Sequence, residues 1–372
     1  MSHTRYFARD YAEARRRFWR AAEQANARVE SHVLDVRGPA DEELAMDVVR
    51  VGPRQPSRLL AVSSGLHGVE AFVGSALQTL LLDTATEILA AHRGLGLLLV
   101  HAVNPFGFAH LDRANERNVD LNRNFVAHPA GHRPNPDYET LADDIAPASL
   151  DDEADRARLD RLGRFVAEHG ARRFENAVSG GQYTHPRGLY FGGHEIQWSA
   201  ERLLGSARTA AEGVERVAWI DVHTGLGASG QVTLLSDLAP AEPAYQRAAR
   251  WYGSDLQSLV GGEALSVVTH GSLDVALLDA LGAAREATMV TAEIGTRPPE
   301  AVFFALRARN WLCHHGELAP DHPRTRAILA AITDAFDPRD DRWRERALLE
   351  ARRSVAAAVA GLGAPASAHA PR

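Results

Sequence analysis

The 372-residue sequence contains no lysine, so arginine supplies all 41 of its basic side chains. A Walker phosphate-binding loop, a Schiff-base enzyme and a lysine general base each require lysine, so these three classes are excluded. The GxSxG turn that presents a nucleophilic serine in many hydrolases is also missing. Any chemistry of this chain must therefore rest on other residue types.

Cysteine, excess positive charge and long apolar runs are also scarce. Cys313 is the single cysteine, which excludes an internal disulfide and favours a reducing compartment. The net charge of −7 gives no electrostatic support for binding nucleic acid. The first residues lack the apolar core of a signal peptide, and the longest apolar run, 95–103, is only strand-sized. We therefore expect a soluble cytoplasmic protein.

The sequence does contain alternating strand and helix patterns within a 45% hydrophobic composition. This alternation predicts an α/β fold with a largely parallel sheet. Strands are predicted at 32–36, 44–51, 58–63, 96–103, 217–222, 231–235, 265–269 and 287–294. Helices are predicted at 8–29, 71–91, 151–169, 196–212, 241–259, 273–282, 299–313, 323–335 and 341–360.

The patterns show no repeat and no convincing linker, so a single catalytic domain is expected over 1–360. Region 126–195 is rich in Pro, His, Gly and Asp, and predicts long loops around one helix that shape a site. The tail 361–372 consists of small residues and proline, which predicts disorder.

An HxxE element, His67 and Glu70, follows the buried strand predicted at 58–63. On a helical turn the two side chains lie on one face, as two ligands of a zinc ion do. The same pattern recurs at His314 and Glu317, where no strand precedes it, and there a surface or packing role is favoured. HxxE alone is therefore weak evidence for a metal site, and the surrounding sequence decides between a metal site and a packing role.

His223 is the candidate third metal ligand, because it ends an apolar strand and enters a glycine-rich turn. A lone histidine there is more often a polar cap, and only its partnership with the other motifs reverses that judgement. Asp221 is expected to point to the opposite face of the strand and is not counted as a ligand. Two neutral histidines and one carboxylate leave a zinc centre positively charged, which lowers the pKa of bound water.

Asn122 and Arg123 place a planar, always-charged fork beside an amide, which suits capture of a substrate carboxylate. The alternative is a loop held by arginine salt bridges. Asp120 is a candidate to hold the second ring nitrogen of a ligand histidine.

Glu293 lies near the end of a buried strand, where a carboxylate pays a desolvation cost that a function would justify. It is the candidate general base, and a buried salt bridge to Arg297 or Arg123 is the alternative. Arg113 is a candidate to hold the developing oxyanion, and Arg117 competes with it on the residues alone.

With these residues in place, the sequence resembles the zinc carboxypeptidases, and specifically the group known as domain of unknown function 2817. The resemblance spans roughly residues 6–350. It rests on the strings SSGLHGVEAFVGSALQ, NPFGFAHLDRANERNVDLNRNF, GQYTHPRGLYFGG, IDVHTGLG, TAEIGT and ALRARNWL.

The resemblance implies an α/β/α sandwich around a central mixed sheet of about eight strands, with one zinc ion per chain at the carboxyl ends of the central strands. The implied roles are zinc binding by His67, Glu70 and His223, base then acid for Glu293, and oxyanion binding for Arg113. Asn122 and Arg123 would hold the substrate carboxylate. In HGSLDVAL, Leu273 falls where the family sorts an apolar side chain.

One departure concerns a mobile tyrosine that zinc carboxypeptidases carry shortly before this pocket segment. The stretch SVVTHG has none. Tyr252 and His270 are weak candidates to replace it. The absence of this tyrosine puts the type of substrate in doubt more than the hydrolytic chemistry, because the tyrosine contacts substrate and is not the base. His185, His194, Tyr190 and Trp198 are candidate pocket residues, although packing is the commoner role for such side chains.

These residues favour a zinc-dependent hydrolase that removes the C-terminal residue of a short peptide or peptide-like amide. The alternative is a deacylase of N-acyl amino acids, similar to aspartoacylase and succinylglutamate desuccinylase. A non-catalytic zinc-binding or metal-free scaffold is a third reading, which the presence of ligands, base and clamp disfavours. The expected partner is a small substrate with a free carboxylate, and neither nucleic acid nor membrane.

Overall fold

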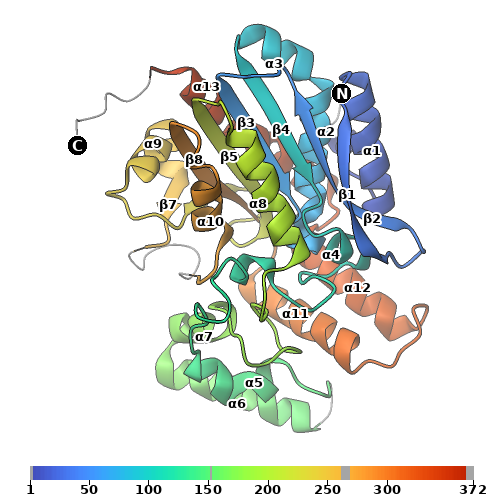
Figure 1. Cartoon of the computed structure of the whole chain (residues 1–372). Coiled ribbons are helices and arrows are strands. Elements are labelled where there is room, and N and C mark those ends of the chain that lie inside the picture. Colours follow the sequence, from blue (N-terminus) through green and yellow to red (C-terminus); the bar gives the residue numbers. More distant parts are fainter. Residues whose placement is uncertain (1–2, 151–152, 261–268, 366–372) are drawn as a thin grey trace.

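The computed structural model describes residues 3–150, 153–260 and 269–365. An eight-stranded sheet lies between two layers of helices (Figure 1), which confirms the expected α/β/α sandwich with a mixed, largely parallel sheet. The strands in spatial order are β1 (Val29–Arg37), β2 (Glu43–Val51), β4 (Leu95–His101), β3 (Arg58–Ser64), β5 (Arg216–Gly225), β8 (Glu286–Gly295), β6 (Val232–Ser236) and β7 (Leu256–Ser258).

The centre of the sheet is parallel and its flanks are antiparallel. β4, β3, β5 and β8 run in one direction, whereas β2 and β6 run antiparallel to their neighbours β4 and β8. Every residue of β5 is buried, which explains its near-continuous apolar sequence. β5 therefore forms the middle of the core, between β3 and β8.

Helices cover the two faces of the sheet with separate apolar clusters. One cluster joins the sheet to α1 (Tyr11–Gln24), α2 (Ala71–Asp83), α9 (Pro243–Tyr252) and α13 (Asp341–Gly363). The cluster on the other face joins it to α8 (Trp198–Ala211) and α10 (Leu273–Ala280). Short elements complete these layers: η1 (His3–Tyr6), η2 (Gly68–Glu70), α3 (Ala85–Ala91), α4 (Pro105–His110), η3 (Leu121–Arg123) and η4 (Gly253–Asp255).

A third group of helices lies beyond one end of the sheet, at the bottom of Figure 1. It contains α5 (Pro136–Ile145), α6 (Glu153–His169), α7 (Ala171–Ser179), α11 (Pro299–His314) and α12 (Pro323–Phe336), which share an apolar cluster of their own. Three of these helices fall within 126–195, so the expectation of long loops around one helix was wrong there. Asn135 caps α5 by accepting from the Tyr138 amide, with Pro136 in the first turn.

The disordered tail was expected to begin at residue 361, but α13 continues to Gly363. Leu362 is buried, and the Arg216 guanidinium donates to the carbonyl oxygens of Leu362 (2.8 Å) and Ala364 (2.6 Å). These bonds fasten the last turn of the helix to the start of β5. Residues 366–372 of the tail and most of the strand expected at 265–269 lie outside the described residues.

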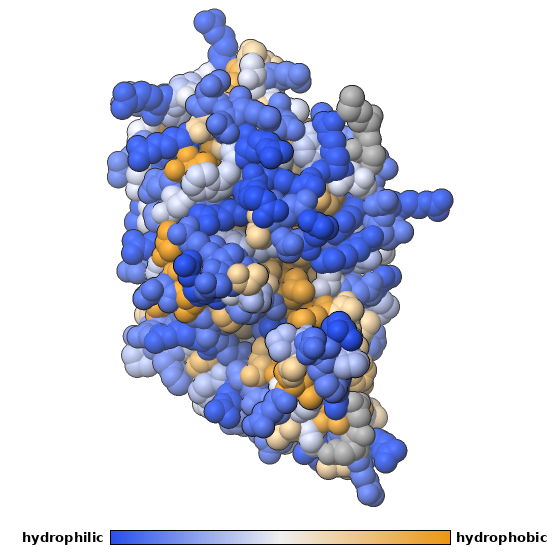
Figure 2. Space-filling model, turned by 90° about the vertical axis from the view of Figure 1, so that its right-hand side faces the viewer, coloured by the Kyte–Doolittle hydropathy of each residue, from blue (hydrophilic) through white to orange (hydrophobic). Residues whose placement is uncertain are grey.

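The expected helix 71–91 is two helices that meet at Thr84, and the short strand β7 was not predicted. Among the described residues, no helix is both long and apolar enough to cross a lipid bilayer. The side of the molecule that faces right in Figure 1 is mostly hydrophilic, with small apolar patches (Figure 2).

Candidate metal centre

The candidate ligands and base meet at the carboxyl ends of three adjacent parallel strands. His67 and Glu70 lie in the turn that follows β3, His223 lies on β5, and Glu293 lies on β8 directly opposite His223. This end of a parallel sheet is where open α/β folds place their ligands. Segments far apart in the sequence are thus brought to one point.

His67, Glu70 and His223 form the only cluster of metal-ligating groups found among the described residues, with ligand atoms within 4.8 Å of one another. The Nδ1 atoms of both histidines lie 3.0 Å from the Glu70 carboxylate and 3.1 Å from each other. Burial opposes ionisation of Glu70, but the charges of His67 and Arg113 lower its pKa overall. The carboxylate is therefore kept anionic between two imidazoles.

The outer ring nitrogen of each histidine is held by a further carboxylate. His67 Nε2 lies 3.0 Å from Asp120 Oδ1, as predicted, and His223 Nε2 lies 2.6 Å from Asp221 Oδ2. Such carboxylate partners set the tautomer and ring orientation of metal-binding histidines. Both Nδ1 atoms are thereby directed at the same point beside Glu70.

The expectation that Asp221 faces away from His223 was wrong. Residues two apart in a strand share a face, so their side chains point the same way. Asp221 is fully buried and accepts from the Ser63 hydroxyl at 2.5 Å, and that hydroxyl accepts from the Trp219 indole at 2.8 Å. The strand period alone could have identified Asp221 as the partner of His223.

Gly68 separates the two ligands of the turn after β3, and the turn depends on it. A Cβ atom at this position would lie 2.0 Å from the carbonyl carbon of Gly107, in α4. The Val69 amide also donates to the Asp112 carbonyl oxygen just beyond α4. Close backbone contact with α4 therefore sets the position of both His67 and Glu70.

Arg113 lies at the metal centre, whereas Arg117 pairs with Glu195 on the surface. The Arg113 guanidinium donates to Glu70 Oε1 (2.6 Å) and Asp120 Oδ2 (3.1 Å). Of the two arginines that the sequence could not distinguish, Arg113 is thus the one that lies beside the candidate ligands.

Glu293 is buried and accepts from the Leu226 amide through Oε1 at 2.9 Å. Its other oxygen, Oε2, has no hydrogen-bond partner in the described part of the chain. Burial, together with the negative charge of Glu70, raises the pKa of Glu293 to about 7. Glu293 forms no ion pair with Arg297, which pairs with Asp334, or with Arg123. A carboxyl with this pKa can take up and release a proton near neutral pH.

Arg123 and Asn122 lie in η3, next to the N-terminus of α10. Asn122 Oδ1 accepts from the Leu273 amide at 2.9 Å. The Arg123 guanidinium is buried and donates to the carbonyl oxygens of Ser179 and Asn122. These bonds use three of its five N–H donors and leave two for a ligand.

The segment 181–193 folds over Arg123. A Cβ atom at Gly181, where φ is +94°, would lie 2.7 Å from Arg123 Cδ. The Tyr183 hydroxyl donates to the Arg123 carbonyl oxygen at 2.7 Å. The clamp is therefore enclosed by the string GQYTHPRGLYFGG.

The remaining candidate residues lie as follows. Leu273 is buried in the apolar cluster beneath α8 and α10, and its sorting role stays a prediction. Tyr252 is in the core on the opposite face of the sheet, and His270 Nε2 lies 2.6 Å from the Gly131 carbonyl oxygen. His185 pairs with Glu139, and His194 lies 3.0 Å from the Tyr183 carbonyl oxygen.

Two features near Arg123 emerge only in the fold: a carboxylate pair that the sequence did not single out, and the contacts of Tyr190, which the sequence offered only as a candidate pocket residue. Asp237 and Asp274 form a carboxylate pair, in which Asp274 accepts from the Thr291 hydroxyl at 3.0 Å. Burial and the neighbouring Asp237 raise the pKa of Asp274 to about 8. The Tyr190 ring lies against the guanidinium groups of both Arg113 and Arg123. Neither group could be placed without the tertiary fold.

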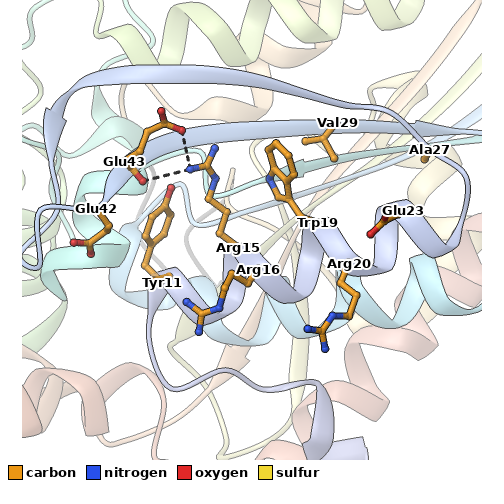
Figure 3. Close-up of a pocket in the computed structure, with 11 residues that line it drawn as sticks. Tyr11, Arg15, Arg16, Trp19, Arg20, Glu23, Ala27, Val29, Glu42 and Glu43 are labelled. Carbon is orange, nitrogen blue, oxygen red and sulfur yellow. Dashed lines mark hydrogen bonds and ion pairs between the residues drawn. The ribbon is translucent and has the colours of Figure 1, made fainter.

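A separate groove of about 920 Å³ lies between α1 and the first two strands (Figure 3). Arg15, Arg16, Trp19 and Arg20 project into it from α1, and Arg15 bonds to Glu43 across it. None of the candidate metal, base or clamp residues lines this groove.

The comparison with protein families finds one match. The model of the family described as "Protein of unknown function (DUF2817)" matches residues 7–350. No curated protein sequence matches the chain.

Two of the solved structures that align with the chain cover nearly all of it. Bovine thrombin-activatable fibrinolysis inhibitor, solved with a tick carboxypeptidase inhibitor, aligns with a TM-score of 0.52 and 12% identity, over 96% of this chain and 97% of that one. Carboxypeptidase A from Helicoverpa armigera aligns with a TM-score of 0.46 and 12% identity, over 95% and 74% of the two chains. At such identity the first of these likenesses shows a shared fold.

Proposed function

The chain belongs to the DUF2817 family of proteins of unknown function, and from this premise we propose that it is a zinc-dependent metallocarboxypeptidase. It would hydrolyse the C-terminal amide bond of short peptides or peptide-like substrates. The cytoplasmic setting expected from the single cysteine is part of the proposal.

The observation that carries this proposal is the convergence of His67, Glu70 and His223. Their ligand atoms lie close enough to bind one ion, and both outer ring nitrogens are held by carboxylates. Imidazole nitrogen and carboxylate oxygen are ligands that zinc accepts, and catalytic zinc sites use three protein ligands. The donor set therefore fits one zinc ion per chain.

When bound, zinc would polarise a substrate carbonyl and make water more acidic. Glu293, whose pKa is raised to about 7, would take a proton from the attacking water at its unpartnered Oε2. The same carboxyl would then pass this proton to the leaving nitrogen. The Leu226 amide fixes the other oxygen, so the carboxyl group stays oriented through both transfers.

Arginine side chains would bind the substrate on both sides of the scissile N–H, one at the scissile carbonyl and one at the carboxylate of the residue that is released. Arg113 lies at the edge of the metal centre and would donate to the oxygen of the scissile carbonyl. Arg123 has two N–H donors left for a carboxylate, and the Asn122 side-chain amide nitrogen has no hydrogen-bond partner in the described part of the chain. The clamp therefore selects a free C-terminal carboxylate.

The enclosure of the clamp supports the alternative of a deacylase of N-acyl amino acids. Arg123 is only 3% exposed and lies under the segment 181–193, which favours a small substrate. Both kinds of substrate present a scissile carbonyl, an N–H and a carboxylate in the same order, so the same residues would serve. The two functions differ only in what precedes the scissile carbonyl.

A mixture of free-acid peptides, the same peptides amidated, and N-acyl amino acids would separate these functions, each incubated with and without a chelator. Mass spectrometry should show chelator-sensitive loss of one C-terminal residue from the free acids and no loss from the amides. Cleavage confined to the N-acyl amino acids would move the assignment to the deacylase.

Two variants test the assignment of the metal and the base. Purified protein should hold close to one zinc per chain by elemental analysis, and His67→Ala should lose most of it. Glu293→Gln should keep the zinc and lose activity. A wild-type protein that stays metal-free after growth with zinc would overturn the proposal, and a fully active Glu293→Gln variant would refute the base.

A further inference from the structure

The Tyr190 side chain contacts both of the arginines proposed to hold substrate. The guanidinium carbon of Arg113 lies 5.1 Å from the centre of its ring, and that of Arg123 lies 5.6 Å from it. Both are cation–π distances. The phenol ring is therefore in contact with the arginine proposed to bind the carbonyl and with the arginine proposed to bind the carboxylate.

Two hydrogen bonds hold the backbone at Tyr190 and at the next residue, Phe191. Its carbonyl oxygen accepts from the Gln182 amide, and the carbonyl oxygen of Phe191 accepts from the Asp120 amide at 2.8 Å. Tyr190 has φ of +55°, a left-handed conformation that costs free energy in a residue other than glycine. The surrounding contacts thus hold the phenol ring in one place against local strain.

The Tyr190 hydroxyl is without a hydrogen-bond partner in the described part of the chain, although the residue is half-buried. It lies within electrostatic reach of Arg113, Asp120, Arg123 and Glu70. Burial raises the pKa of Tyr190, so the hydroxyl keeps its proton at neutral pH. A neutral hydroxyl can both accept and donate a hydrogen bond.

The order of groups in the substrate determines what this hydroxyl would meet. Along the substrate, the scissile carbonyl is followed by the N–H, the Cα atom and the carboxylate of the residue to be released. A group in contact with both the arginine for the carbonyl and the arginine for the carboxylate is therefore within reach of the N–H. We propose that the Tyr190 hydroxyl accepts a hydrogen bond from the scissile N–H and so recognises an amide substrate.

This inference rests on the proposed function, and it holds for a peptide and for an N-acyl amino acid alike. Its test compares an amide substrate with the matched ester, in which oxygen replaces the scissile N–H. Tyr190→Phe retains the ring against the two arginines and removes only the hydroxyl. It should lower kcat/KM for the amide about three- to tenfold and leave the ester unchanged, as expected for one hydrogen bond.

Tyr245→Phe, which removes a phenol hydroxyl from α9 away from the metal centre, is the matched control and should change neither rate. Equal losses on amide and ester would mean that Tyr190 acts only by packing against the arginines, and would overturn the proposal. An unchanged amide rate in Tyr190→Phe would overturn it as well.

The same comparison can be made without turnover, which separates this inference from the proposed function. In a Glu293→Gln background, calorimetry should show the amide binding more tightly than the ester, and Tyr190→Phe should remove that difference. A wild-type enzyme that hydrolyses neither compound refutes the proposed function, whereas equal binding of amide and ester before the Tyr190 substitution refutes the inference.

Discussion

At the scale of single residues, the candidate metal centre depends on side chains that are not candidate ligands themselves. Asp120 and Asp221 each hold one ligand histidine through its outer ring nitrogen. Burial opposes a charge on His223, but Asp221 raises the pKa of this histidine well above its usual value. The negative charge of Asp221 thus increases the basicity of His223.

Asp221→Asn is predicted to weaken zinc binding about 10- to 100-fold, because the amide orients and polarises His223 less than the carboxylate does. Competition with a chromophoric chelator would measure the change in affinity. Asp35→Asn, an exposed aspartate on β1, is the matched control and should bind zinc as the wild type does. Unchanged affinity in Asp221→Asn would mean that the carboxylate serves only the fold.

The ligands, base and clamp could be proposed from the sequence because each lies in a distinctive local string. The choice between Arg113 and Arg117 could not be made, since both occur in one string and only the fold directs Arg113 inward. Asp221 could have been found from the strand period. Tyr190 was proposed only as a candidate pocket residue, because its contacts are with two arginines far from it in sequence.

At the scale of elements, one turn and one helix position the metal ligands. The turn η2 packs against α4 so closely that only glycine fits at position 68. The atoms that a Cβ would meet belong to the backbone of Gly107 and Phe108, which cannot rotate away as a side chain can. The helix α4 is thus part of the site although it contributes no candidate ligand of its own.

Gly68→Ala is predicted to destabilise the protein by about 1–3 kcal/mol and to lower its zinc content, because the forced shift moves His67 and Glu70. Urea unfolding and elemental analysis would measure the two effects. Gly205→Ala in α8 is the matched control, since a Cβ there meets nothing within 4 Å. It should stabilise the protein by about 0.5–1 kcal/mol, and a Gly68→Ala variant as stable as the wild type would contradict the packing argument.

Most elements were predictable because long apolar periodic runs form the sheet and its covering helices. The helices α5 and α7 were missed since they are short and polar, and they bury their apolar side chains in a cluster shared with α6, α11 and α12. The end of α13 was missed because its small residues resemble a linker. There the bonds from Arg216 stabilise the last turn, and no local pattern reveals such a distant donor.

At the scale of the whole molecule, a buried polar cluster joins α1 to the sheet. His101 on β4 is fully buried, stacks on Phe18 and lies 3.0 Å from the Ser75 hydroxyl. The neighbouring Asp47 accepts from the Arg15 guanidinium and the Trp19 indole. Burial lowers the pKa of His101 to about 4, so the imidazole is neutral in the folded protein.

The free energy of unfolding is predicted to fall as the pH drops from about 6.5 to 4. The folded state keeps His101 neutral, while the unfolded chain binds a proton near pH 6.5, so stability present above that pH is lost below it. The full shift corresponds to roughly 3–4 kcal/mol. Urea unfolding at pH 7 and pH 5 should show His101→Gln to be less sensitive to pH than the wild type, and equal sensitivity would refute the assignment.

The order of the strands along the chain also determines the order in which the residues of the site are synthesised. β3, β5 and β8 are neighbours in the sheet, but β8 is the last of the three in the sequence. A chain emerging from the ribosome would contain all three candidate ligands well before Glu293 has been synthesised. The site would therefore gain its candidate ligands before its candidate base, and would be complete only once β8 has joined the sheet.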